Sequence, residues 1–275
     1  MLLVLAIAVS CAPALRAPPK AAPAPAGAEP APSAPRGGEA APSAAALLEE
    51  ARTRFARRPD VEQVRKAEAL FLAAAAADPS GVDGLAGAVE TRIWRIDHER
   101  GADRGALAAS ALDAGQACVA RAPASARCDY ALALALGMQA RERRGTALDG
   151  LKKMVEHLRR AAAAEPTLDD AGPARVLAIV LVRAPAWPLG PGDPEAGLEA
   201  ARRAVALAPA YPPNTLALAE ALVATGSPAE GRAAAERGVA LARARTGDPD
   251  APEWIRDGEA LAARAAQAEV APPPP

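Results

Sequence analysis

The chain has 275 residues, of which 51% are hydrophobic but only 3% are aromatic. A core built mainly from Ala, Leu and Val favours close contact between helices. The net charge of −1, from 32 basic and 33 acidic residues, gives no electrostatic reason to expect a nucleic acid or an anionic membrane as a partner. The scarcity of aromatic rings also leaves little for base stacking.

The chain begins with an apolar segment, residues 2–9, much shorter than the ~20 residues that cross a bilayer. It leads into AVSC, which ends at Cys11 and resembles the lipobox of bacterial lipoproteins. The resemblance implies that residues 1–10 are a signal peptide and that Cys11 carries a diacylglycerol group, since stable anchoring takes about two acyl chains. By resemblance to the sorting rule of such lipoproteins, Ala12, rather than an aspartate, after the lipidated cysteine favours the outer membrane. Because no basic residue precedes the segment, an ordinary secretory signal and a buried apolar N-terminus are the alternatives.

Residues 11–43 are rich in Pro and Ala, a composition that buries too little apolar surface to fold. They predict an extended tether, in which ~30 residues at ~3.1 Å each reach on the order of 90 Å. Residues 271–275 form a short tail of similar composition. We therefore expect the folded domain at 44–270.

Similar phrases ending in proline recur at intervals of 40 to 44 residues, at Pro79, Pro123, Pro166, Pro209 and Pro249. Proline ends a helix because it lacks an N–H and disfavours helical backbone at the preceding residue. Between these prolines the apolar pattern predicts pairs of helices. We place them at 81–101 and 104–122, 126–145 and 146–165, 169–184 and 193–208, and 213–226 and 227–245.

Residues typical of helix ends separate the two helices of a pair. Glycines that suit a C-terminal end follow three of the first helices, at Gly101, Gly145 and Gly226. Candidate N-caps precede the second helices at Thr146, Asp193 and Ser227. The adjacent acids Asp169 and Asp170 are expected to favour the start of a helix through its dipole.

Paired helices with this period predict an all-α fold, an α-solenoid of tetratricopeptide-like repeats. The segment at 169–226 also resembles TatT, the periplasmic T-component of tripartite (TRAP) transporters, in which a loop with aromatic and proline residues ends in Gly-Asp. The matching positions in the loop are Pro185, Trp187, Gly190, Gly192 and Asp193. Ala196 and Ala204 match in the predicted helix that follows the loop. The resemblance implies a helical-repeat lipoprotein with a partner protein and an apolar ligand in a central channel.

Five residues are candidates for binding a partner or ligand. First helices of stacked repeats line the inner face, so we place Arg92, Trp94 and Arg95 there; the alternative is that Trp94 packs in the core and the charges are solvated. Trp187 either packs the 184–193 loop onto the helices or contacts a partner. Asn214 is expected to hold the chain at the start of a helix, with ligand contact as the alternative.

Cys118 and Cys128 flank a repeat boundary, which in an exported protein predicts a disulfide. A disulfide that closes a loop this short would stabilise the fold by at most roughly 2–3 kcal/mol on the chain-entropy model. The alternative is that the two cysteines are buried free thiols. Their spacing matches no zinc pattern, so we expect no metal site. His157 is expected on a helix surface.

The sequence lacks the motifs of nucleophilic hydrolases, zinc proteases and phosphate-binding loops, so we expect neither catalysis nor a cofactor. We predict a lipid-anchored scaffold on the periplasmic face of the bacterial envelope, bound to an envelope protein. The alternative is a transporter accessory that binds an apolar small molecule. A wide apolar channel would favour that alternative, and a charge-lined groove would favour the scaffold.

The lipid anchor predicts that Cys11→Ala moves the protein from the membrane fraction to the soluble fraction, because no acyl chain can attach. Fractionation and immunoblotting of cells that express each form measure the shift. A Cys11→Ala chain that still fractionates with membranes would rule out the anchor.

Overall fold

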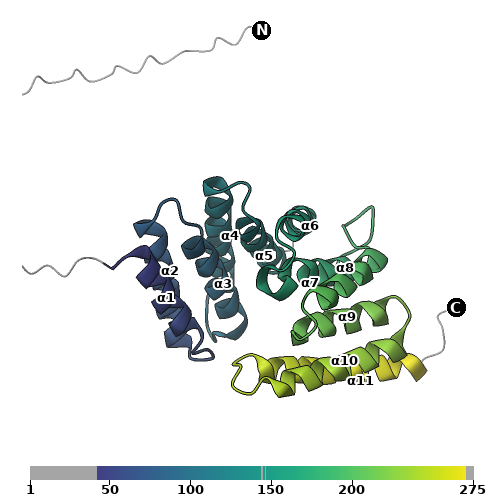
Figure 1. The fold of residues 1–275 in the computed structure, drawn as a ribbon. Helices are drawn as coiled ribbons and strands as arrows, with labels where there is room; N and C mark the ends of the chain where they lie inside the picture. Colours follow the sequence, from purple (N-terminus) through teal and green to yellow (C-terminus); the bar gives the residue numbers. More distant parts are fainter. Residues whose placement is uncertain (1–41, 144, 146, 271–275) are drawn as a thin grey trace, which may run out of the picture. The chain divides into compact units, whose positions relative to one another are not determined.

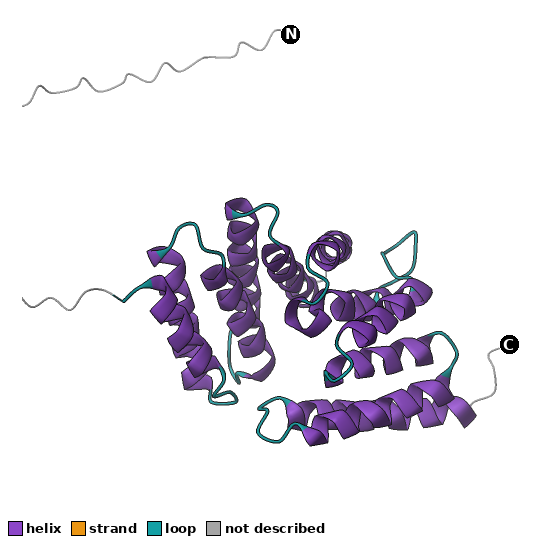
Figure 2. Cartoon of the chain, in the orientation of Figure 1, coloured by secondary structure: helices purple, strands orange, loops and turns teal. Residues whose placement is uncertain are grey.

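The computed structural model describes residues 42–143, 145 and 147–270. The predicted signal peptide, Cys11, the tether up to residue 41, Thr146 and the tail at 271–275 lie outside the described residues. The described chain consists of helices joined by short turns, with one longer loop between residues 183 and 194 (Figure 2). None of these helices is both long and apolar enough to span a membrane.

The described residues form eleven helices that pack in chain order (Figure 1). They are α1 (Ala44–Phe55), α2 (Val61–Ala77), α3 (Asp83–His98), α4 (Arg104–Arg121), α5 (Ala126–Glu142), α6 (Ala147–Ala164), α7 (Leu168–Arg183), α8 (Pro194–Leu207), α9 (Pro212–Ala224), α10 (Pro228–Ala244) and α11 (Ala251–Val270). Each helix contacts the next, and each odd-numbered helix also contacts the next odd-numbered one. The odd-numbered helices therefore form one layer of a two-layer helical array.

This arrangement confirms the all-α solenoid. The eight predicted helices correspond to α3 to α10, with ends that differ by a few residues. All five recurring prolines lie in the turns that follow an even-numbered helix, where the missing N–H costs no intrahelical bond. The repeat unit is thus an odd-numbered helix, a turn, an even-numbered helix and a proline-containing turn.

Most of the predicted helix ends are in place. Gly101 and Gly226 have φ angles of 77° and 82°, the left-handed region that glycine tolerates best. Asp193 is the N-cap of α8, and its Oδ1 accepts a hydrogen bond of 3.0 Å from the Ala196 N–H. Ser227 occupies the N-cap position of α10 but makes no side-chain capping bond. Gly145 lies in the α5–α6 turn.

Alanine lets these helices approach closely. Where α3, α4 and α5 meet, the packed side chains are mainly small, and Ala111 and Ala135 have no exposed surface. Larger apolar residues fill the wider gaps between helices, as Leu158 and Leu181 do between α6 and α7. The composition therefore predicted the core correctly.

The two repeat-boundary cysteines meet in the interior. Cys118 near the end of α4 and Cys128 near the start of α5 have no exposed surface, and their Cα atoms are 5.2 Å apart with the sulfurs at bonding distance. This separation suits a bridge. Oxidation also requires an oxidising compartment, so the disulfide stays a prediction that depends on export of the chain.

Candidate functional site

The odd-numbered helices α3 to α11 present side chains to a set of cavities, and we call this face the inner surface. One cavity lies between α3, α5 and α7, a second between α7, α9 and α11, and a third between the α1–α2 turn, α3 and α11. Charged side chains from several helices line all three. First helices of the repeats line these cavities, but the residues of α3 that do so differ from two of those predicted.

Arg92 and Arg95 face α2 rather than the inner surface. Both pair with Glu68: Arg92 Nε lies 2.7 Å from Glu68 Oε1, and Arg95 Nη1 lies 2.5 Å from Oε2. Arg92 also donates to the carbonyl of Ser110, and Arg95 donates to Glu99. The side chains of Arg92 and Arg95 are only 11% and 18% exposed. The prediction that they line the inner face is therefore wrong, because their side of α3 packs on the neighbouring helices.

Trp94 is a core residue with one edge at the inner surface. It is 9% exposed, belongs to the cluster around Phe55 and Phe71, and stacks on His98 with ring centroids 4.5 Å apart. It also forms part of the wall of the cavity beside α11. Its placement agrees with packing in the core.

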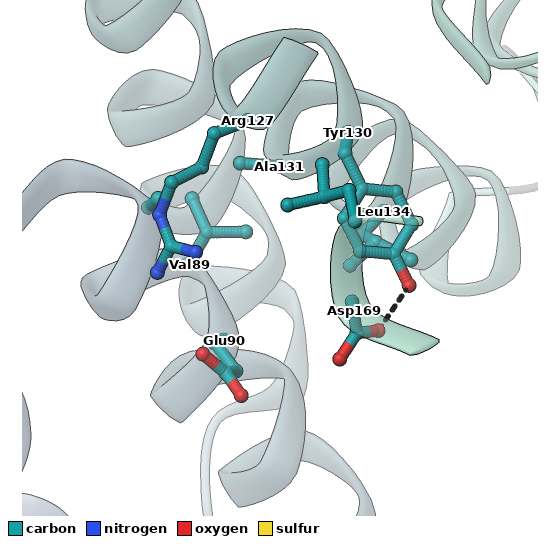
Figure 3. A pocket seen from close by; sticks show the side chains of 9 residues that line it. Val89, Glu90, Arg127, Tyr130, Ala131, Leu134 and Asp169 are labelled. Atoms are coloured by element: carbon teal, nitrogen blue, oxygen red, sulfur yellow. Dashed lines mark hydrogen bonds between the residues drawn. The ribbon is translucent and has the colours of Figure 1, made fainter. Parts of the chain in front are cut away.

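The residues of α3 that do face inward are spaced three, four and seven apart, as one helix face requires. Glu90, Ile93 and Asp97 line the cavity beside α11, and Val89 and Glu90 line the cavity beside α5. Glu90 therefore lies where the two cavities adjoin. We call the cavity between α3, α5 and α7, about 90 Å³, the central cavity (Figure 3).

Figure 3 shows Arg127 and Tyr130 from α5 and Asp169 from α7 around the central cavity, with Glu90 below. The Tyr130 hydroxyl donates a 2.8 Å hydrogen bond to Asp169 Oδ2. Burial, and then the charge of Asp169, raise the pKa of Tyr130 well above its ordinary value. The phenol therefore stays protonated and acts as a donor.

Asp169 reaches this position because the chain makes a left-handed turn at the start of α7. Asp169, Asp170 and Ala171 have φ angles of 50°, 50° and 65°. This backbone costs about 1–2 kcal/mol per residue without glycine. The acids at 169 and 170 are thus not a simple helix start, which corrects the sequence-based expectation.

A buried polar network holds the turn. Arg175 donates from Nη2 to Asp169 Oδ2 at 2.9 Å and from Nη1 to the carbonyls of Asp169 and Asp170 at 3.2 Å. Asn214 Oδ1 accepts from Arg175 at 3.1 Å, and its Nδ2 lies 2.9 to 3.2 Å from the carbonyl oxygens of Asp170, Ala204 and Ala208. The network ties the turn to the end of α8 and the start of α9.

Asn214 has no exposed surface. Its predicted role in holding the chain at a helix start agrees with these bonds, and the alternative of ligand contact is corrected, because the side chain cannot reach a partner. His157 also differs from expectation: its side chain is 16% exposed, and Nδ1 lies 2.7 Å from the buried Asp129.

Glu90 has an unusual environment for a carboxylate. Its side chain is exposed to solvent at the inner surface, where it lines both the central cavity and the cavity beside α11. Burial, and then the nearby Asp169, raise its pKa, while Arg127 and Arg58 act in the opposite sense. Among the described residues it forms no hydrogen bond or direct ion pair through its side chain.

Two ion pairs join the first helices to the last one, and we call them the clasp. Arg58, in the α1–α2 turn, donates to Asp250 from Nε at 2.9 Å and from Nη2 at 2.7 Å. His98 Nε2, at the end of α3, lies 3.0 Å from Glu253 Oε2 on α11. The α1–α2 turn and the α10–α11 turn approach each other in Figure 1. The clasp borders a cavity of about 330 Å³, the clasp cavity.

One of the two ion pairs of the clasp, His98–Glu253, depends on the protonation of His98. Burial lowers the pKa of His98, but hydrogen bonds to Glu253 and to the Trp94 carbonyl outweigh it, so the pKa is raised. Because this pKa is raised, the His98–Glu253 pair stabilises the fold when His98 is protonated. That stabilisation is lost as the pH rises through the folded-state pKa of His98.

The 184–193 loop carries the two most exposed large hydrophobic side chains of the described residues. Trp187 is 85% exposed and Leu189 is 66% exposed. We call residues 187–189 the loop tip. Because Trp187 extends into solvent, the interpretation that it packs the loop onto the helices is wrong.

The loop is ordered by its own backbone. Gly192 N–H donates to the Pro185 carbonyl and Asp193 N–H donates to Leu181, both at 2.9 Å. A Cβ atom on Gly192 would lie 2.1 Å from the Ala184 carbonyl oxygen, so only glycine fits. The loop tip is therefore held in place, which lowers the entropy cost of binding through it.

Comparison with solved structures supports the fold. TTC0263, a thermophilic TPR (tetratricopeptide repeat) protein of Thermus thermophilus, is similar at 19% identity with a TM-score of 0.57, and the match covers 83% of this chain and 100% of that one. Yeast Tom70 is similar at 16% identity with a TM-score of 0.51; the match covers 82% of this chain but only 41% of Tom70. At these identities the likeness shows a TPR-like fold and nothing more.

No protein-family model matches the sequence, and no curated protein matches it. The comparisons give no support for the TRAP-transporter T-component in particular, so that resemblance stays a prediction.

The buried network predicts that Asn214→Ala lowers the free energy of unfolding by about 2–4 kcal/mol, because buried carbonyls and Arg175 lose a partner. Urea denaturation measures the change. Trp187→Ala is the control and should change stability by less than about 0.5 kcal/mol, as an exposed substitution does. Equal effects of the two substitutions would contradict this account of Asn214.

Proposed function

We propose that this protein is a non-catalytic scaffold, anchored to a bacterial membrane through Cys11, that binds a protein partner through its inner surface and loop tip. The observation that carries the proposal is the charge-lined inner surface. Glu90, Arg127 and Asp169 line the central cavity, and the other two inner cavities add further charged residues. A polar surface of this kind suits a peptide segment better than an apolar solute.

The loop tip supports the same proposal. Exposed tryptophan is enriched where proteins bind one another, because a large rigid ring buries much area at little entropic cost. Trp187 and Leu189 are presented on a loop whose backbone bonds fix it. A protein partner that covers this tip would remove its apolar surface from water.

A second candidate function is the binding of an apolar small molecule in the manner implied by the transporter resemblance. A cavity of about 400 Å³ between α5, α6 and α7 favours it. Its walls are mainly apolar, with Leu134, Met138, Met154 and Ile179 among them and Arg183 beside them. Methionine-lined grooves adapt to varied apolar ligands.

Affinity capture from envelope extract, followed by mass spectrometry of proteins and small molecules, tests both candidates. We expect a specific envelope protein with the native chain and roughly tenfold less of it with Trp187→Ala, a loss typical of an interface anchor. Leu148→Ala, which removes a 42% exposed side chain on α6, is the matched control and should capture normally.

Capture of an apolar molecule without a specific protein would favour the second candidate. A partner recovered equally with native and Trp187→Ala chains would remove the loop tip from the interface. The melting temperature of Trp187→Ala should equal that of the native chain, since the side chain has almost no contacts to lose.

A further inference from the structure

The clasp cavity has more carboxylates than cations. Five acidic residues line it, namely Glu90, Asp97, Asp250, Glu253 and Asp257, against Arg58 and His98. Three of the five have partners: Asp250 pairs with Arg58, Glu253 with His98, and Asp97 with Arg141 at 2.6 Å. Glu90 on α3 and Asp257 on α11 pair with no cation among the described residues.

These two carboxylates are exposed in the cavity, and the pKa of each is raised above its ordinary value. Glu90 keeps exposed surface in the cavity, and its pKa is raised by desolvation and then by Asp169, while Arg127 and Arg58 act in the opposite sense. Burial, and then Glu253, also raise the pKa of Asp257. A cation that enters the cavity would favour the charged form of both carboxylates, because opposite charges attract.

The other walls of the clasp cavity are apolar and aromatic. They are formed by Phe55, Ile93, Trp94 and Trp254. Such walls suit the aliphatic part of a long basic side chain and the flat face of a guanidinium. The volume of about 330 Å³ lies at the low end for ligand sites, so it fits a side chain or a short segment.

The cavity already holds one guanidinium in this way. Arg58 lies 4.6 Å above the ring of Phe55 while it forms both hydrogen bonds to Asp250. Aromatic contact combined with a forked pair to a carboxylate is the geometry that distinguishes arginine from lysine. The unpaired Glu90 and Asp257 offer the charges for a second such group.

We propose that the clasp cavity binds an arginine side chain from an extended segment of a partner protein, with Glu90 and Asp257 as its anionic contacts and Trp254 beside its aliphatic part. This inference rests on the proposed scaffold function and names the chemistry that the partner carries. It also places the bound segment against α3 and α11, next to the clasp.

Selection of phage-displayed random dodecapeptides on the immobilised full chain tests the proposal. We expect the selected peptides to be enriched in arginine. A selected peptide is then synthesised with arginine or with citrulline, its uncharged analogue, at that position. Citrulline should weaken binding at least tenfold in fluorescence anisotropy, since it keeps the shape and removes the charge.

Glu90→Gln should weaken binding of the arginine peptide by about tenfold, because one ion pair between the peptide and the cavity is lost. Glu199→Gln makes the same chemical change at an exposed position on α8 and should have no effect. Glu90→Gln should fold normally and keep the native melting temperature, because the Glu90 side chain forms no hydrogen bond or ion pair among the described residues. Asp257→Asn provides a second, independent variant.

Three outcomes would overturn the proposal: no selected peptide, selected peptides without arginine, or binding that citrulline and Glu90→Gln leave unchanged. Each leaves the scaffold function standing if the native chain still captures an envelope protein. Failure of that capture as well would remove the proposed function itself.

Discussion

The guanidinium of Arg175 lies at the junction of α7, α8 and α9, where a charge is tolerated only if its donors find acceptors. Asp169, Asp170 and Asn214 supply them, and the face of Tyr211 lies 4.9 Å away. These bonds compensate the cost of three successive left-handed residues. They also hold the turn through which the chain enters α7. The network thus holds Asp169 beside Tyr130 and adds polar contacts to the apolar packing of α9 on α8.

The inner surface follows from that network and from the small side chains of the helices. Close alanine contacts stack the odd-numbered helices in one layer, and the left-handed turn brings a carboxylate of α7 into that layer. The clasp then joins the two ends of the array through Arg58 and Asp250, 192 positions apart in sequence. Charges that are far apart along the chain therefore come to surround Glu90, and this convergence gives the inner surface its capacity to bind a basic group.

The sequence was sufficient to predict the helices but not most of the site. Proline spacing and capping residues predicted α3 to α10, because both act within one or two turns of the chain. On α3, Arg92 and Arg95 were predicted to line the inner surface because they are charges beside a tryptophan. Their ion pairs with Glu68 instead hold them against α2, away from that surface. The spacing of Glu90, Ile93 and Asp97 was available as a signal for the inward face. The left-handed turn and the clasp had no local signal, since each depends on partners tens to hundreds of residues away.

The claim that the described helices enclose an inner surface is tested most directly by a distance measurement across the clasp. Spin labels at Arg57→Cys and Thr246→Cys, in a chain with Cys11→Ser, report the separation of the α1–α2 and α10–α11 turns by pulsed electron paramagnetic resonance. We expect one narrow distribution of distances between the labels. When Asp250→Asn and Glu253→Gln remove the clasp, the mean distance should increase and the distribution should broaden. A broad distribution in the chain with an intact clasp, or one that these substitutions leave unchanged, would contradict the claim.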